Sequence, residues 1–142
     1  MKINKEWLKE KSVCSEGVKW FKARKFKTDS QVIGDLMADD KLEWANWVIA
    51  RIMKRKQYLS YTIFAAEQVL ELFEKKYPDD KRPREAIEAA RAVFKEDTAE
   101  NRVAARVAWV TAGVTWVAWD TTSKGTQIRI LKHGLKLMGW KS

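Results

Sequence analysis

The side chains that most often perform chemistry in enzymes are scarce in this sequence. His133 is the only histidine and Cys14 the only cysteine, and the nearest acid to Cys14 is Glu16, with no histidine beside it. Most histidine-based triads and dyads, and most zinc sites, need more of these residues than the chain has. We therefore expect a solvated His133 and a buried or half-buried Cys14 that packs as a small apolar residue.

Acidic pairs and glycines do not supply a catalytic motif either. Asp39-Asp40 and Asp79-Asp80 are adjacent residues whose side chains point in different directions, so helix capping and turn formation explain them better than paired acid-base catalysis. The six glycines are isolated, and none forms a Gly-rich phosphate loop. The sequence predicts a protein that is not an enzyme, with no catalytic residues, no metal site and no cofactor.

Basic and aromatic side chains are the candidates for binding. Residues 22–27 interleave four cations with a phenylalanine, and residues 51–56 carry a second basic cluster. Cations for phosphates and rings for stacking are typical of single-stranded nucleic-acid binders, while solvated helix ends explain the same clusters without any ligand. Tryptophan and arginine also dominate the hot spots of protein interfaces. The predicted binding residues are Lys22, Arg24, Lys25, Arg51, Lys54, Arg55, Trp109, Trp116 and Trp119.

Charge and length set the class of protein. A chain of 142 residues predicts one domain, residues 1–142. Its 46% hydrophobic and 33% charged residues are those of a soluble globular protein. The net charge of +9 favours an acidic partner, such as nucleic acid, a phosphorylated ligand or an acidic protein, unless the surplus serves only solubility. The eight tryptophans form either a core or a stacking surface.

The sequence gives no sign of a membrane or secretory segment. No stretch approaches the roughly 18 uncharged apolar residues of a membrane span, and the charged N-terminus lacks an apolar run of secretory length. A single cysteine allows no intramolecular disulfide. We therefore expect a cytoplasmic protein that does not bind membranes and that could form a homo-oligomer.

Residues 39–53 predict the helix around which the others pack. Asp39 and Asp40 can cap a helix that runs from about Asp40 to Met53. Offsets of three and four residues place four large apolar side chains on one face, where we expect them to be buried together: Trp44, Trp47, Val48 and Ile52.

Apolar periodicity and capping residues predict further helices on both sides. Short amphipathic helices are expected within residues 1–27, and longer ones from Thr28 to Ala38, from Gln57 to Tyr77 and after Pro83. Residues 102–120 are rich in Val, Thr and Trp, but the capping signal at residues 97–100 favours helix. The predicted fold is all-α, a single compact helical bundle of about six to seven helices with a long C-terminal helical region. Gly125 leaves open whether residues 99–138 form one helix or two.

Three stretches together resemble a known family. They are Cys14-x-x-Gly17-x-x-Trp20, the segment Glu43–Arg51 and the segment Lys81–Glu88, followed by a helical tail with alanines and aromatic residues. In that order they resemble the immunity proteins of bacterial polymorphic toxin systems, in the fifth-immunity-family-like domain that phages also carry. The resemblance implies an all-helical, non-enzymatic protein that neutralises a target such as a toxin.

Two functions from different classes follow. The first is an inhibitor of a protein target, either a toxin or a host defence enzyme, that acts through a basic, Trp-rich helical surface. The second is a protein that binds or sequesters a phosphorylated nucleotide or nucleic acid, with tryptophans stacked on bases and cations on phosphates. A structural helical protein with all eight tryptophans buried is the third possibility.

Overall fold

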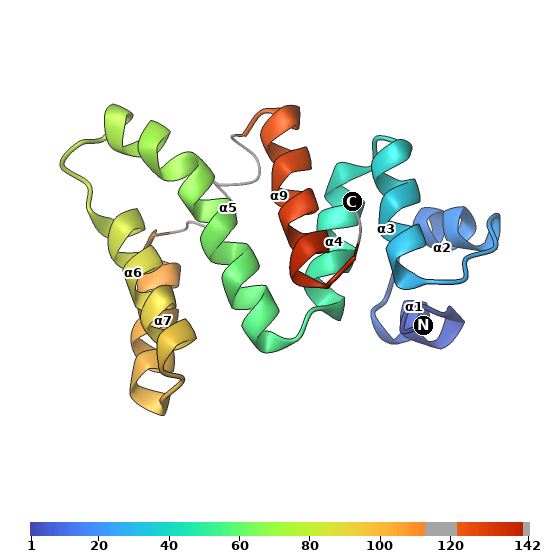
Figure 1. Cartoon of the computed structure of the whole chain (residues 1–142), viewed down its shortest axis with the longest axis horizontal. Helices are drawn as coiled ribbons and strands as arrows, with labels where there is room; N and C mark the ends of the chain where they lie inside the picture. The colour runs from blue at the N-terminus through green and yellow to red at the C-terminus, as the bar shows by residue number, and fades with distance from the viewer. Residues whose placement is uncertain (113–121, 141–142) are drawn as a thin grey trace. The chain divides into compact units, whose positions relative to one another are not determined.

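A computed structural model describes residues 1–112 and 122–140, and for residues 107–112 only the backbone (Figure 1). Every regular element in these residues is a helix, which confirms the predicted all-α class. The helices are α1 (Lys5–Glu10), α2 (Ser15–Lys22), α3 (Asp29–Ala38), α4 (Leu42–Ile52), α5 (Arg55–Lys76), α6 (Arg82–Lys95), α7 (Ala99–Ala112) and α9 (Lys124–Leu137).

The contacts within the chain divide it into two compact units. Unit 1 is formed by residues 1–52, and unit 2 by the described residues from Met53 onward. The single domain expected from chain length stays a prediction. Within the described residues, no helix is long and apolar enough to cross a membrane.

Unit 1 is held together by a small apolar core and by the start of α3. Thr28 caps α3 with its hydroxyl while Gln31 reaches back to the backbone of Thr28, which is the reciprocal capping box that the sequence signals. The carboxylate of Asp29 accepts the backbone N–H groups of Lys2 and Ile3 at 2.9 and 2.8 Å, so the N-terminus is fastened to α3. The core residues of this unit are Ile3, Leu8, Val32, Ile33, Leu36, Leu42, Ala45, Ile49 and Ile52.

Helix α4 differs from its prediction in two ways. It begins at Leu42, because Asp39 is the C-cap of α3 and Asp40 takes a left-handed conformation (φ 60°), so the aspartates end one helix rather than start the next. Its buried face consists of Leu42, Ala45, Ile49 and Ile52. Trp44, Trp47 and Val48 are only half-buried, so the expectation that they are buried with Ile52 was wrong.

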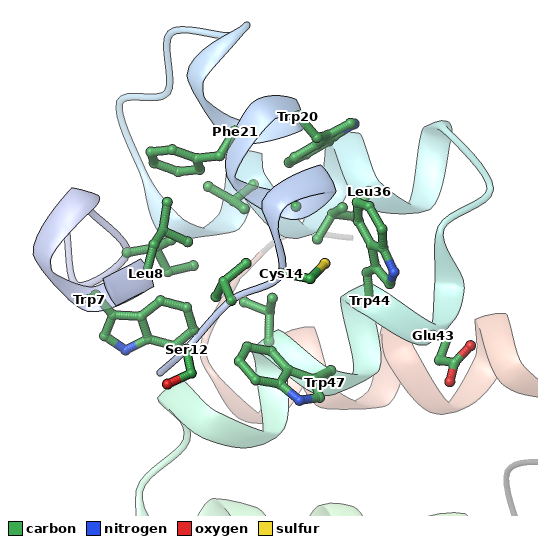
Figure 2. A pocket seen from close by; sticks show the side chains of 15 residues that line it. Trp7, Leu8, Ser12, Cys14, Trp20, Phe21, Leu36, Glu43, Trp44 and Trp47 are labelled. Atoms are coloured by element: carbon green, nitrogen blue, oxygen red, sulfur yellow. The ribbon is translucent and has the colours of Figure 1, made fainter. Parts of the chain in front are cut away.

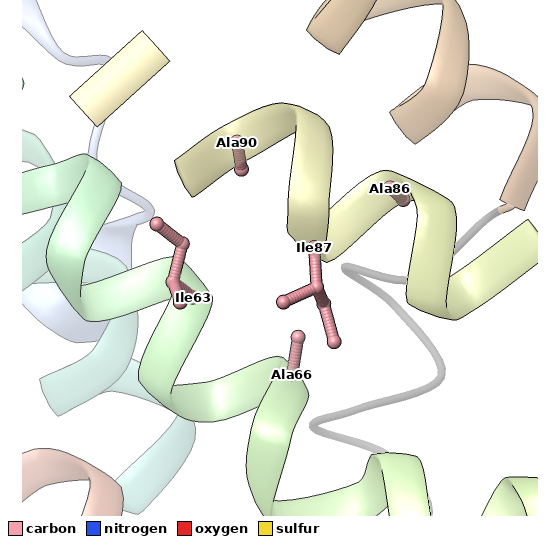
Figure 3. Close-up of a cluster of buried hydrophobic side chains, with 5 residues drawn as sticks. All are labelled: Ile63, Ala66, Ala86, Ile87 and Ala90. Atoms are coloured by element: carbon pink, nitrogen blue, oxygen red, sulfur yellow. The ribbon is translucent and has the colours of Figure 1, made fainter. Parts of the chain in front are cut away.

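Unit 2 is built around α5, which packs against both α6 and α9, while α7 packs on α6. Figure 3 shows the cluster between α5 and α6, where alanines let the two backbones approach and the isoleucines fill the remaining space: Ile63, Ala66, Ala86, Ile87 and Ala90. The predicted boundaries are close to the observed ones, since α5 starts two residues before the predicted Gln57 and α6 starts one residue before Pro83. Helix α5 ends at Lys76 just before Tyr77-Pro78, and Pro83 lies in the first turn of α6.

The region rich in Val, Thr and Trp is helical as far as it is described. The hydroxyl of Thr98 accepts the backbone N–H of Asn101 and caps α7, which runs to Ala112 and confirms helix over strand for this part. Helix α9 starts at Lys124 with Ser123 as its cap. The rest of this predicted helical region, residues 113–120, lies outside the described residues.

Candidate functional site

Four tryptophans of unit 1 line one pocket. Trp7 comes from α1, Trp20 from α2, and Trp44 and Trp47 from α4, and together they border a cavity of about 380 Å³ (Figure 2). Buried side chains such as Leu8 and Leu36 complete its apolar lining. Trp7 meets Trp47 edge to face, with ring centroids 6.0 Å apart. We call this cavity the tryptophan pocket.

Three cations lie on the rings of this pocket. The guanidinium of Arg24 lies 4.4 Å from the ring centroid of Trp20, and that of Arg51 lies 3.7 Å from the ring centroid of Trp47. The ammonium of Lys41 lies 4.3 Å from the ring of Trp44. At these distances a cation is attracted by the electron-rich face of an indole. Arg24 and Arg51 are both residues that the sequence predicted for binding, and the structure places both beside the same pocket.

Two carboxylates accompany these cations. Asp39 accepts from the indole N–H of Trp20 and from Arg24, both at 2.7 Å, so its charge is shared between two donors. Glu43 is exposed and lines the edge of the pocket. Within the part of the chain that the structure describes, neither Lys41 nor Arg51 has a carboxylate partner. The surroundings of the pocket are therefore positive overall.

The other predicted cations divide between the two units. Lys22 and Lys25 are exposed in unit 1 and have no described ion pair. Lys54 and Arg55 lie at the start of α5 in unit 2, where Arg55 contacts Asp97 at 3.2 Å. Arg102 binds the same carboxylate, and the hydrogen bonds from Arg102 and Arg55 hold the pKa of Asp97 well below its usual range.

More cations lie at this end of unit 2. The ammonium of Lys56 is 5.2 Å from the ring of Phe94, and Gln57 donates to the carbonyl of Leu137 at 3.2 Å, which joins the start of α5 to the end of α9. Helix α9 carries four lysine or arginine residues and no acid. We define the basic end of unit 2 by five residues from α5, α7, α9 and the residue before α5: Lys54, Arg55, Lys56, Arg102 and Lys136.

The side chains of the predicted tryptophans of the C-terminal region lie outside the described residues. Trp109 lies on α7, of which the side chains from residue 107 are not described. Trp116 and Trp119 lie outside the described residues. The tryptophans that form a site are others, and the sequence signalled two of them: the spacing of Trp44 and Trp47 marked one helical face, but we interpreted that face as core.

Cys14 and His133 both differ from their expected surroundings. Cys14 is exposed and lines the tryptophan pocket, and in Figure 2 it lies between the rings of Trp44 and Trp47. His133 is not fully solvated, because its ring stacks on Phe64 with centroids 3.9 Å apart. Partial burial lowers the pKa of His133 from its ordinary value, with a further contribution from Lys136.

The described residues supply binding groups of two kinds. Aromatic rings and cations meet in the tryptophan pocket, and cations gather at the basic end of unit 2. Among the residues with described positions, no three His, Cys, Asp or Glu side chains are grouped so that they could hold a metal ion. The geometry therefore points to recognition of anionic or aromatic partners.

Comparison with known proteins finds a family match for part of the chain. No curated protein and no solved structure matches it. Residues 49–112, which run from the end of α4 through α7, match the model of the family described as "Imm-5 like putative immunity protein". This match agrees with the family resemblance carried by the sequence motifs, and residues 49–112 are similar to that immunity family.

Proposed function

We propose that the protein is a non-enzymatic inhibitor that neutralises a protein target, a toxin or a host defence enzyme, by binding an acidic surface of that target at the basic end of unit 2. The family match supports a neutralising protein with a protein partner. The basic end lies largely within the matched residues, since Lys54, Arg55, Lys56 and Arg102 all fall between positions 49 and 112.

The observation that carries the proposal is the sharing of Asp97 by two arginines. Arg55 and Arg102 approach one carboxylate from two different helices, so the positive charge is fixed in position and only partly neutralised. Lys54, Lys56 and Lys136 have no ion pair with any described residue. Even when Glu96, Asp97 and Glu100 are counted, cations outnumber carboxylates here. A target with a cluster of Asp and Glu would be complementary in charge.

Exposed aromatic rings accompany this charge. Tyr58 is 39% exposed on α5, and Phe94 is 41% exposed at the end of α6, close to Lys56. Aromatic and arginine side chains contribute most to protein interfaces, because they bury large areas with few rotatable bonds. The basic end thus combines a steering charge with two candidate anchors.

Charge reversal at the two ends of α5 tests the proposal. Lys54→Glu with Lys56→Glu should abolish protection when the chain is expressed together with a toxin or defence enzyme that the wild-type chain neutralises. The new carboxylates at the start of a helix favour the helix dipole, so loss of folding would not explain the result. Lys75→Glu with Lys76→Glu makes the same change in charge at the far end of α5, where both lysines are exposed.

The control should protect as well as the wild type. Equal protection by both variants would show that the basic end of unit 2 does not take part in the interface. If the wild-type chain gave no protection against any toxin or defence enzyme, the neutralising function itself would be wrong.

Nucleic acid is the alternative partner for the same surface, since cations and exposed rings also suit a single strand. The equilibrium affinity of a nucleic-acid complex falls by about 10³–10⁵ between 50 and 200 mM salt when six to ten phosphates are contacted. A protein complex with an apolar centre loses mainly association rate over that range. If the chain bound a single-stranded oligonucleotide with an affinity that fell this steeply with salt, nucleic acid would be favoured as the partner.

A further inference from the structure

We propose that the tryptophan pocket of unit 1 binds a free nucleotide, with the base stacked on the indole rings and the phosphate held by Arg51 and Lys41. This inference concerns a different unit from the proposed inhibitor surface and does not depend on the protein target. The pocket is small enough to enclose a single ligand, since its 380 Å³ lies at the lower end of the range of about 300–1,000 Å³ for small-molecule sites.

The aromatic lining suits a flat, unsaturated ring. Trp44 and Trp47 present large π-surfaces from adjacent turns of α4, and Trp7 approaches Trp47 edge to face from α1 (Figure 2). A nucleobase gains about 1–3 kcal/mol from stacking on one aromatic side chain. Because these rings are half-buried rather than enclosed in the core, they remain accessible from the cavity.

The charges select an anion. An aromatic cage can also bind a quaternary ammonium, but here Arg24, Lys41 and Arg51 already lie on three of the rings. A cationic ligand in the pocket would be repelled by these three groups. A phosphate beside the rings would instead gain charge-assisted hydrogen bonds from Arg51 and Lys41, which have no carboxylate partner among the described residues.

Two acidic side chains limit where the phosphate can lie. Asp39 is engaged by Arg24 and Trp20, which makes Arg24 the least available of the three cations. Glu43 is exposed at the edge of the cavity, and its carboxylate repels a phosphate from that edge. These restrictions leave Arg51, whose guanidinium is 3.7 Å from the ring of Trp47, as the main phosphate contact.

Cys14 offers a direct test, since it is the only cysteine, is exposed and lines the pocket. We would measure the rate at which N-ethylmaleimide alkylates Cys14 in the full chain, by intact-mass spectrometry, with rising concentrations of AMP, GMP, CMP and UMP. At least one of these should slow alkylation at least about fivefold, in a saturable way, because the bound base covers the sulfur. Adenosine or guanosine should need about ten times the concentration of AMP or GMP, or more, to give the same protection of Cys14, since the charge-assisted phosphate contact is lost.

A matched pair of variants tests whether Arg51 contacts the phosphate. Arg51→Gln should raise the concentration of nucleotide needed for protection about tenfold and leave protection by nucleosides unchanged. Arg129→Gln removes an equally exposed arginine from unit 2 and should behave like the wild type. Circular dichroism of both variants would verify that they remain folded.

The outcomes that overturn the proposal are distinct. Absence of protection by all four nucleotides would exclude a nucleotide from the pocket. Protection by a single-stranded oligonucleotide, without any by mononucleotides, would assign the pocket to nucleic acid. Equal losses for Arg51→Gln and Arg129→Gln would show that the effect comes from net charge and not from a contact in the pocket.

Discussion

Three indole rings in unit 1 each carry a cation that lies in the same helix or within two residues of one of its ends. Arg24 follows Trp20 by four residues, Arg51 follows Trp47 by four, and Lys41 precedes Trp44 by three. Residues at these spacings are neighbours on a helix surface. Both arginines also donate to the backbone carbonyl of the tryptophan below them, at 3.0 and 3.1 Å. Local spacing therefore helps to position these cations, and Asp39 at the end of α3 also holds Arg24.

Half-burial of Trp47 changes the expected cost of removing it. A fully buried tryptophan replaced by alanine costs about 3–5 kcal/mol of the free energy of unfolding. Trp47 borders a cavity and has solvent on part of its ring, so we expect Trp47→Ala to cost only about 1–2 kcal/mol.

The matched variant is Ile49→Ala two residues further along α4. Ile49 is 0% exposed, and its truncation should cost about 2–5 kcal/mol. Urea unfolding followed by circular dichroism compares the two. A larger loss for Trp47→Ala than for Ile49→Ala would place Trp47 in the core after all.

His133 should make the stability depend on pH. Its pKa in the folded protein is lowered by burial, so below the ordinary histidine pKa of about 6.5 the unfolded chain binds the proton more readily than the folded one. The free energy of unfolding should therefore be highest above about pH 7, where His133 is neutral in both states, and should fall as the pH decreases towards 5. His133→Gln should flatten this dependence, because the chain has no other histidine. Urea titrations at several pH values measure this dependence. If the free energy of unfolding of His133→Gln changed with pH as steeply as that of the wild type, His133 would not be its cause.

At the scale of elements, two glycines in helices of unit 1 have opposite surroundings. A Cβ atom at Gly17 in α2 would come within 2.8 Å of Val13 Cγ1, closer than two carbon atoms can approach without displacement. A Cβ atom at Gly34 in α3 would meet nothing within 4 Å. The close approach at Gly17 allows the segment after α1 to pack on α2 beside the tryptophan pocket.

Alanine at these two positions should give effects of opposite sign. Gly34→Ala should stabilise the protein by about 0.5–1 kcal/mol, because alanine restricts the unfolded chain and favours helix. Gly17→Ala gains the same propensity but must displace a stiff β-branched side chain, so we expect a net loss of stability. Thermal unfolding of the two variants compares them directly. A gain of stability in both would show that Val13 moves aside without cost.

At the scale of the whole molecule, the net charge of +9 should act on the rate of association more than on the lifetime of a complex. For a complex with the proposed protein target, we expect the association rate constant to fall about tenfold or more between 20 and 300 mM NaCl, while the dissociation rate constant changes less than about threefold. Stopped-flow measurements with purified partners would show this. A dissociation rate that rises as steeply as the association rate falls would indicate that the complex is held mainly by ion pairs at its centre.

The sequence by itself determined the helical class, because apolar spacing, capping residues such as Thr28 and Thr98, and the prolines at 78 and 83 act over a few residues each. Spacings of three and four residues also place the cations near the indoles, although we did not predict these pairs from the sequence. Only the tertiary structure decided which face of α4 is core, because both faces carry large apolar side chains and the packing of α4 on α3 leaves Ile49 buried and Trp47 half-buried. It likewise brought Arg55 and Arg102 onto one carboxylate across 47 positions of sequence, a contact that depends on how α5, α6 and α7 pack and that no local pattern encodes.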